Sequence, residues 1–80
     1  MEQGQIYQRL NDIFGDVFDD DSLALKPETT ADDVDGWDSL SHIRLVMSVE
    51  KAFNLKFSAA EVGRLKNVGE LVGLIQSKLQ

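Results

Sequence analysis

Residues 38–53 read DSLSHIRLVMSVEKAF, and this stretch decides the fold that the rest of the chain is expected to adopt. At about 100° per residue, one set of apolar side chains falls on a single face. It comprises Leu45, Val46, Val49 and Phe53, with Ala52 at its edge. We expect a helix from about Ser39 to Phe53 that buries this face. Asp38 should cap it, because a carboxylate accepts a hydrogen bond from a free backbone N–H and complements the positive helix end.

The same helix carries a second apolar face on nearly the opposite side. It comprises Leu40, Ile43 and Met47, with Arg44 and Lys51 beside it. A chain of 80 residues has too small a core to bury both sides of one helix. We therefore predict that this stripe is an exposed partner surface. The alternative is that the long preceding loop folds back over Leu40 and Ile43.

Three further helices are predicted outward from this stretch. Residues 3–18 place apolar side chains at helical spacing, namely Ile6, Leu10, Ile13, Phe14, Val17 and Phe18. Ser58 and Glu61 have capping-box spacing and predict a short helix to about Leu65. Asn67 should cap a last helix whose apolar stripe comprises Val68, Leu71, Val72, Ile75 and Leu79. The sequence therefore predicts one all-α domain over residues 1–80, with three longer helices and one short helix.

A long polar stretch, DDDSLALKPETTADDVDGWD, joins the first two predicted helices. Its seven aspartates, two threonines and the only proline make regular structure unexpected there. Four apolar residues interrupt it: Leu23, Leu25, Val34 and Trp37. We expect these residues to pin the loop across the core, since a merely flexible linker would not need them.

Composition excludes several classes of site. Without cysteine there is no disulfide, thiolate metal site or cysteine nucleophile. The single histidine, His42, offers too few soft ligands for zinc or copper. No apolar run reaches the roughly 18 residues of a membrane span, and the N-terminus lacks a signal-peptide pattern. We therefore expect a cytoplasmic protein without membrane insertion.

The charge is distributed unevenly along the chain. The net charge of −6 argues against nucleic acid, whose phosphates need a basic surface. Residues 1–38 hold 11 acidic against 2 basic side chains, whereas residues 39–80 hold 3 against 6. Such a domain is expected to present different faces to different partners, although a solvated acidic loop would give the same count.

Ser39 and His42 are separated by one helical turn, so a hydrolase with a serine nucleophile and a histidine base is one hypothesis. The oriented base, the oxyanion hole and the G-x-S-x-G elbow that such an enzyme needs are missing, so no catalysis is expected. A lone histidine on a core face is more often packed and hydrogen-bonded than catalytic. Asp19 and Asp21 have the alternate spacing of a calcium loop, but the turn glycine and distal glutamate do not follow. The remaining possibility is that Ser39 is itself a substrate, with Asp38 helping to hold a metal ion.

Over almost its whole length the chain resembles the acyl carrier proteins. The resemblance rests on Asp38-Ser39-Leu40 at mid-chain followed by L-V-M-x-x-E-x-x-F, and it extends over DSLSHIRLVMSVEKAFNLKFSAAEVGRLKNVGEL. It implies a four-helix carrier-protein bundle with a long loop between the first and second helices. It also implies that a phosphopantetheinyl transferase uses coenzyme A and magnesium to attach 4′-phosphopantetheine to Ser39. The thiol of this group would carry an acyl group as a thioester, which supplies a cysteine-free chain with a reactive thiol.

The resemblance also assigns roles to individual residues. Asp38 would assist magnesium during the transfer, and Leu40 would contact the transferase. The partner surface predicted above from the helical spacing comprises Leu40, Ile43, Arg44, Met47 and Lys51. The acyl pocket comprises Leu45, Val49 and Phe53 in the bundle interior, with His42 near its mouth. Further partners would be an acyl-loading ligase or synthetase and an acyltransferase or synthase, and the chain is expected to be a monomer.

Two departures from the family favour a specialised carrier over one for general fatty acid biosynthesis. Ser41 and Arg44 stand where carriers of fatty acid synthesis usually have acids, and His42 stands where a smaller residue is usual. They suggest synthetase, polyketide-type or lipid-modifying partners, and they lead to the hypothesis that His42 restricts or polarises the pocket mouth. Trp37 points the same way, unless its ring simply pins the loop to the bundle. Two alternatives stay open: an aminoacyl or peptidyl carrier, and a non-enzymatic adaptor that docks through Leu40, Ile43 and Met47.

Overall fold

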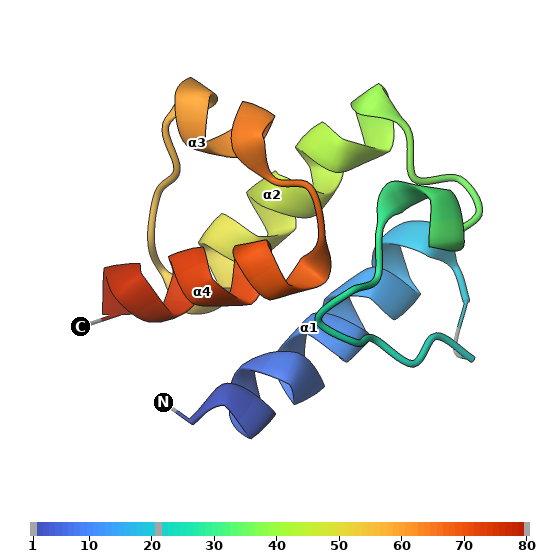
Figure 1. Cartoon of the computed structure of the whole chain (residues 1–80), viewed down its shortest axis with the longest axis horizontal. Coiled ribbons are helices and arrows are strands. Elements are labelled where there is room, and N and C mark those ends of the chain that lie inside the picture. Colours follow the sequence, from blue (N-terminus) through green and yellow to red (C-terminus); the bar gives the residue numbers. More distant parts are fainter. Residues whose placement is uncertain (1, 21, 80) are drawn as a thin grey trace.

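The computed structural model describes residues 2–20 and 22–79, which form helices and no strand (Figure 1). The elements are α1 (Gln3–Phe18), the 3₁₀ turn η1 (Ala31–Asp33), α2 (Ser39–Phe53), α3 (Ala59–Arg64) and α4 (Val68–Leu79). Helix α1 packs against both α2 and α4, and the short α3 lies near α2 on the side away from α1. The predicted all-α fold, with three longer helices and one short helix, is confirmed.

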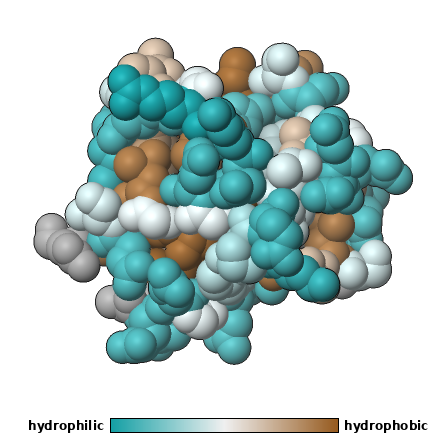
Figure 2. Space-filling view, viewed as in Figure 1, coloured by the Kyte–Doolittle hydropathy of each residue, from teal (hydrophilic) through white to brown (hydrophobic). Residues whose placement is uncertain are grey.

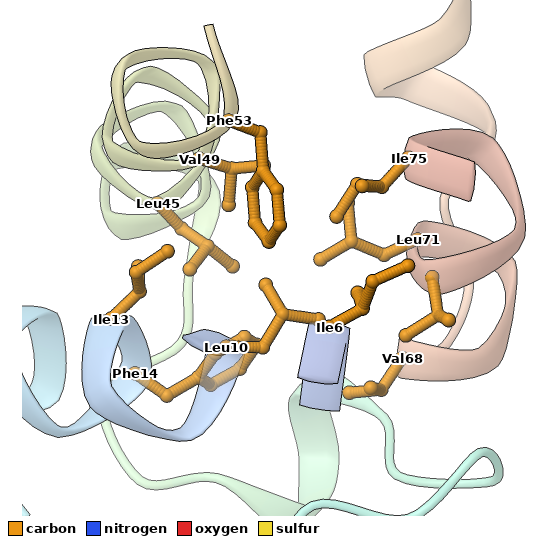
Figure 3. Packing of buried hydrophobic residues seen from close by; sticks show 11 residues of the cluster. Ile6, Leu10, Ile13, Phe14, Leu45, Val49, Phe53, Val68, Leu71 and Ile75 are labelled. Atoms are coloured by element: carbon orange, nitrogen blue, oxygen red, sulfur yellow. The ribbon is translucent and has the colours of Figure 1, made fainter. Parts of the chain in front are cut away.

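Helices α1, α2 and α4 share one hydrophobic core. Figure 3 shows their side chains pointing toward a common centre. The cluster comprises Ile6, Leu10, Ile13, Phe14, Leu45, Val49, Phe53, Val68, Leu71, Val72 and Ile75. The predicted core face of α2 is confirmed, because Val46 is also buried and Ala52 packs against the cluster. Leu79 differs from the prediction: it lies at the last position of α4 and is exposed.

Helices α2, α3 and α4 begin where side-chain caps accept hydrogen bonds from backbone N–H groups of the first turn. Asp38 Oδ1 accepts from the Ser41 N–H at 2.9 Å, which confirms the predicted cap of α2. Ser58 Oγ accepts from the Glu61 N–H at 3.1 Å and caps α3. Asn67 Oδ1 accepts from the Glu70 N–H at 2.8 Å at the start of α4. These short-range bonds explain why local spacing predicted the helix starts.

The loop between α1 and α2 is pinned to the core as expected. Val34 is buried, and Leu23, Leu25 and Trp37 pack against the core cluster. The expectation that the loop has no regular structure is wrong at one place, the 3₁₀ turn η1. The Thr30 N–H donates to Asp33 Oδ2 at 3.0 Å and closes a local capping box, which stabilises a short turn despite the polar composition.

Backbone hydrogen bonds hold the same loop against α4. The Val68 N–H donates to the Thr29 carbonyl and the Gly69 N–H to the Pro27 carbonyl, both at 2.9 Å. Two N–H groups at the start of α4 thus find partners about 40 residues earlier in the chain, which satisfies groups that a helix start otherwise leaves free. The loop is therefore part of the bundle.

Hydrophilic residues cover most of the face in Figure 2, and hydrophobic residues emerge between them in separate spots. Among the described residues, no helix has both the length and the apolar character needed to cross a membrane.

Candidate functional site

Ser39 is the first residue of α2, and it is exposed. The chain reaches it through a turn at Gly36, whose φ of 86° is a conformation that side chains with a Cβ disfavour. The start of a helix also concentrates partial positive charge and N–H groups, which favour an anion such as a phosphate. The predicted attachment residue is therefore accessible and rigidly placed.

Asp38 and Ser41 form a compact hydrogen-bonded pair around the start of α2. Asp38 Oδ1 accepts from the Ser41 backbone N–H at 2.9 Å and from the Ser41 hydroxyl at 2.7 Å. The Ser41 hydroxyl also lies within hydrogen-bond reach of the Gly36 carbonyl. The two bonds from Ser41, the backbone bond first, lower the pKa of the exposed Asp38 carboxyl. Asp38 therefore presents an ionised carboxylate beside Ser39.

His42 connects the loop to α3. The Trp37 indole Nε1–H donates to His42 Nδ1 at 3.1 Å, and His42 Nε2 lies 3.2 Å from the Val62 carbonyl. An indole nitrogen can only donate, so His42 Nδ1 is the acceptor. His42 Nε2 then carries the proton and donates a hydrogen bond to the Val62 carbonyl oxygen. The Trp37 and His42 rings are nearly parallel, at 21°. These contacts agree with the interpretation of His42 as a packed, hydrogen-bonded residue. One of its two hydrogen-bond partners is the loop residue Trp37.

Trp37 is held from a second side by aromatic contacts with α1. Its ring meets Phe14 edge to face at 5.2 Å between centroids and lies 6.0 Å from Phe18. Such edge-to-face pairs stabilise by ~1 kcal/mol beyond their area burial. The ring is thus anchored to α1 and hydrogen-bonded to α2.

An open groove of about 440 Å³ begins beside Ser39. Its wall includes the loop, the first turn of α2 and the end of α3, with the residues Ala31, Trp37, Asp38, Ser39, His42, Val62, Gly63, Leu65 and Lys66. The groove combines apolar surface with one ammonium group, that of Lys66, and one carboxylate, that of Asp38. Four of these residues, from Val62 to Lys66, were not recognised from the sequence, because the capping signals located α3 along the chain but did not show what it faces.

The second apolar face of α2 is exposed, as predicted. Leu40, Ile43 and Met47 are 71%, 55% and 63% exposed. Arg44 and Lys51 are also exposed on the same helix. The loop therefore leaves Leu40 and Ile43 uncovered, and the alternative in which it folds over them is wrong.

The residues predicted to form an acyl pocket lie in two different places. Leu45, Val49 and Phe53 are part of the close-packed core, and none of them lines the groove. His42 is half-buried and lines the groove. The four residues therefore do not surround one open cavity in this structure.

The residues considered for metal binding do not converge. Among residues 2–20 and 22–79, no group of three or more His, Asp or Glu side chains is placed to hold a metal ion. Asp19 ends α1 in a left-handed conformation, with φ of 52°, while Asp21 lies outside the described residues.

Comparison with known proteins identifies the family. The family model described as "Phosphopantetheine attachment site" matches residues 8–75. The chain is 30% identical over 79 residues to an acyl carrier protein of Coprothermobacter proteolyticus, covering 99% of this chain and 96% of that protein. It is 28% identical over 72 residues to an acyl carrier protein of Clostridium acetobutylicum, covering 90% and 94%.

A solved structure agrees with these sequence relatives. The solution NMR structure of a holo acyl carrier protein from Geobacter metallireducens matches with a TM-score of 0.85 and 49% identity, covering 91% of this chain and 84% of that one. The chain therefore belongs to the acyl carrier protein family, whose members carry a covalently attached 4′-phosphopantetheine.

Proposed function

We propose that Ser39 is the residue that receives 4′-phosphopantetheine, and that the chain carries an acyl group between the enzymes of a specialised pathway. The single observation that supports this most strongly is the placement of Ser39, exposed at the start of α2 and beside an ionised carboxylate. The chain itself performs no catalysis in this proposal, and it acts as a monomer in the cytoplasm.

The residues around Ser39 suit the attached group. The positive end of α2 favours the phosphate, and the groove that begins at Ser39 contains the Lys66 ammonium together with apolar surface. Asp38 is available as a magnesium ligand during the transfer, since hydrogen bonds from Ser41 lower its pKa. When attached, the group supplies a thiol that holds an acyl group as a thioester.

The attachment is a phosphoryl transfer in which Ser39 provides the nucleophile. Its hydroxyl oxygen forms a bond to the phosphorus next to the pantetheine, the pyrophosphate bond of coenzyme A breaks, and the nucleotide part leaves. The hydroxyl proton goes to a base of the transferase, so this chain supplies no base for the step. Ser39 requires only exposure and a fixed direction, which the first turn of α2 provides.

Incubation with coenzyme A, magnesium and a broad-specificity phosphopantetheinyl transferase tests the attachment. We expect mass spectrometry to show the addition of one phosphopantetheinyl group, located by peptide mapping to Ser39. Ser39→Ala should remain unmodified, whereas the control Ser48→Ala, in the same helix, should be modified like the wild type. Transfer to the Ser39→Ala variant, or none to the wild type, would contradict the proposal.

A specialised role is favoured by the basic rim of the exposed α2 face. Arg44 and Lys51 accompany Leu40, Ile43 and Met47, so this face suits partner enzymes with an apolar, acidic-rimmed docking site. We propose the loading ligase or synthetase and the acyltransferase or synthase as those partners. Mass spectrometry of the protein from its native host would identify the group bound as a thioester. If that group is an aminoacyl or peptidyl group, the chain is an aminoacyl or peptidyl carrier and the acyl assignment is wrong.

A further inference from the structure

We propose that Trp37 protects a thioester carried by this chain from hydrolysis, because its indole N–H occupies the one nitrogen through which His42 would act as a base. The inference rests on the proposed attachment at Ser39. It concerns how long the loaded thioester survives, and it makes Trp37 a positioning residue that acts only through His42.

His42 lies where a base would meet the thioester. Ser39 and His42 line the same groove, so a group tethered to Ser39 starts on a wall that His42 shares. Tethering raises the effective concentration of the thioester around this wall. The inference therefore needs only repeated encounters, and no fixed position of the arm. Imidazole is also the side chain most often used as a general base near neutral pH.

A free imidazole at this place would promote thioester hydrolysis. It would take a proton from a water molecule while the water oxygen forms a bond to the thioester carbonyl carbon. The carbon–sulfur bond then breaks, and the proton passes from the imidazole to the departing thiolate. The products are a carboxylic acid and the free thiol of the arm, so the carrier would lose its acyl group without a partner enzyme.

Both nitrogens of His42 are occupied in the structure. A neutral imidazole has one nitrogen that accepts a hydrogen bond and one that donates. Nδ1 accepts from the Trp37 indole N–H at 3.1 Å, and Nε2–H donates to the Val62 carbonyl at 3.2 Å. The Trp37 ring also meets Phe14 edge to face, at 5.2 Å between centroids, which keeps its N–H directed at Nδ1. The basic lone pair is therefore not offered to water.

The other polar side chains of the groove wall are poor bases. Two hydrogen bonds from Ser41 to Asp38 Oδ1 lower the pKa of the Asp38 carboxyl, which makes its carboxylate a weaker base. The Lys66 ammonium has N–H donors and no acceptor. Among the described residues that line the groove, His42 is thus the one that becomes a base when its partner is removed.

Removal of the indole N–H should expose this base. Trp37→Phe keeps an aromatic ring beside Phe14 but has no donor for His42 Nδ1. We expect its acetyl thioester, loaded from acetyl coenzyme A by the transferase, to hydrolyse about 10-fold faster than that of the wild type, since acid–base catalysis by a well-placed side chain contributes about 10²–10⁴-fold. Intact-protein mass spectrometry measures the loss of the acetyl group over time. Equal half-lives would overturn the inference.

A double variant separates this effect from a loosened structure. His42→Gln provides one acceptor and one donor but no basic nitrogen. We expect His42→Gln and the double variant Trp37→Phe/His42→Gln to have the half-life of the wild type. If the double variant hydrolyses as fast as Trp37→Phe, or if His42→Gln alone hydrolyses more slowly than the wild type, His42 is not the masked base.

Phe18→Leu is the control for packing around the Trp37 ring. Phe18 lies 6.0 Å from Trp37 between ring centroids and takes no part in the hydrogen bond to His42. This variant should keep the half-life of the wild type. A half-life as short as that of Trp37→Phe would show that loosened packing, and not the exposed nitrogen, causes the hydrolysis.

Diethyl pyrocarbonate tests the occupied nitrogen in the wild type itself. The reagent acylates an unprotonated imidazole nitrogen, and the chain has a single histidine. We expect slow reaction of the folded apo protein and rapid reaction in urea. Equal rates would overturn the inference, and this comparison decides if Trp37→Phe does not fold.

The two proposals fail in different ways. If mass spectrometry shows no phosphopantetheinyl group on the wild type, attachment at Ser39 fails and the protective role of Trp37 fails with it. If the group is added and the variants hydrolyse alike, only the protective role fails.

Discussion

Asp38 caps the start of α2, and hydrogen bonds from Ser41 lower the pKa of the Asp38 carboxyl. The Ser41 N–H and hydroxyl both donate to Asp38 Oδ1, at 2.9 Å and 2.7 Å. Ser41 completes the capping box at the start of α2. A second carboxylate at this place would repel Asp38, while a hydroxyl stabilises it.

Ser41→Ala should raise the pKa of the Asp38 carboxyl part of the way to its ordinary value. The variant loses the hydroxyl bond and keeps the backbone bond, which is the larger cause of the lowered pKa. A carboxyl whose pKa is lowered in the folded state stabilises the fold above about pH 4, and that contribution is lost as the pH falls through the folded pKa.

An NMR titration of the side-chain carboxyl carbons measures this change. Asp20 is an internal control, because Ser22 lowers its pKa and Ser41 is not involved. A pKa of Asp38 that is the same in Ser41→Ala and in the wild type would contradict the assigned cause.

At the scale of one element, α2 buries apolar side chains on one side and exposes apolar side chains on the other. Leu45 and Val49 are fully buried, whereas Leu40 and Met47 are 71% and 63% exposed. Exposed apolar side chains add little to stability in the free protein and are available to a partner. Substitutions on the two sides should therefore have different consequences.

Leu40→Ala should lower the kcat/KM of the phosphopantetheinyl transferase by about 5–10-fold, as expected for an interface residue worth ~1 kcal/mol or slightly more. The effect should lie mainly in KM, because the proposed role of Leu40 is to contact the transferase away from the reacting atoms. The thermal midpoint should hardly change, since the side chain is exposed.

Leu79→Ala is the matched control, as Leu79 is another exposed leucine but on α4. It should leave kcat/KM unchanged. If both variants lowered kcat/KM equally, the α2 face would not be the docking surface.

In the whole molecule, the long loop is joined to α4 at a place that tolerates no side chain. A Cβ at Gly69 would lie 2.9 Å from the Pro27 carbonyl oxygen and 3.2 Å from the Pro27 Cβ. The same residue donates its N–H to that carbonyl at 2.9 Å. This contact holds together segments that are distant in sequence.

Gly69→Ala should therefore lower the free energy of unfolding by ~1–3 kcal/mol, the usual effect of forcing an extra carbon into a packed contact. Gly73→Ala, in the same helix, should raise it by ~0.5–1 kcal/mol, because a Cβ there meets nothing within 4 Å and alanine favours a helix over glycine. Urea unfolding followed by circular dichroism measures both. Equal effects of the two substitutions would show that the Gly69–Pro27 contact is unimportant.

The sequence by itself determined the helices, their starts and the faces that the three longer helices bury. Caps such as Asp38, Ser58 and Asn67 act over three residues, and an apolar stripe repeats every turn, so both are visible as local spacing. The motif Asp38-Ser39-Leu40, on which the proposed attachment site rests, is equally local. The η1 turn was missed because its capping pair lies inside a stretch whose composition indicates a loop.

Only the tertiary structure decided what lies beside Ser39. His42 meets the Val62 carbonyl 20 residues later, and Pro27 meets Gly69, without any local signal for either contact. Such contacts depend on how the loop and the short helix α3 pack on the bundle. That packing must satisfy buried polar groups and fill space over the whole molecule. The groove, the anchored Trp37 ring and the open α2 face are products of that packing.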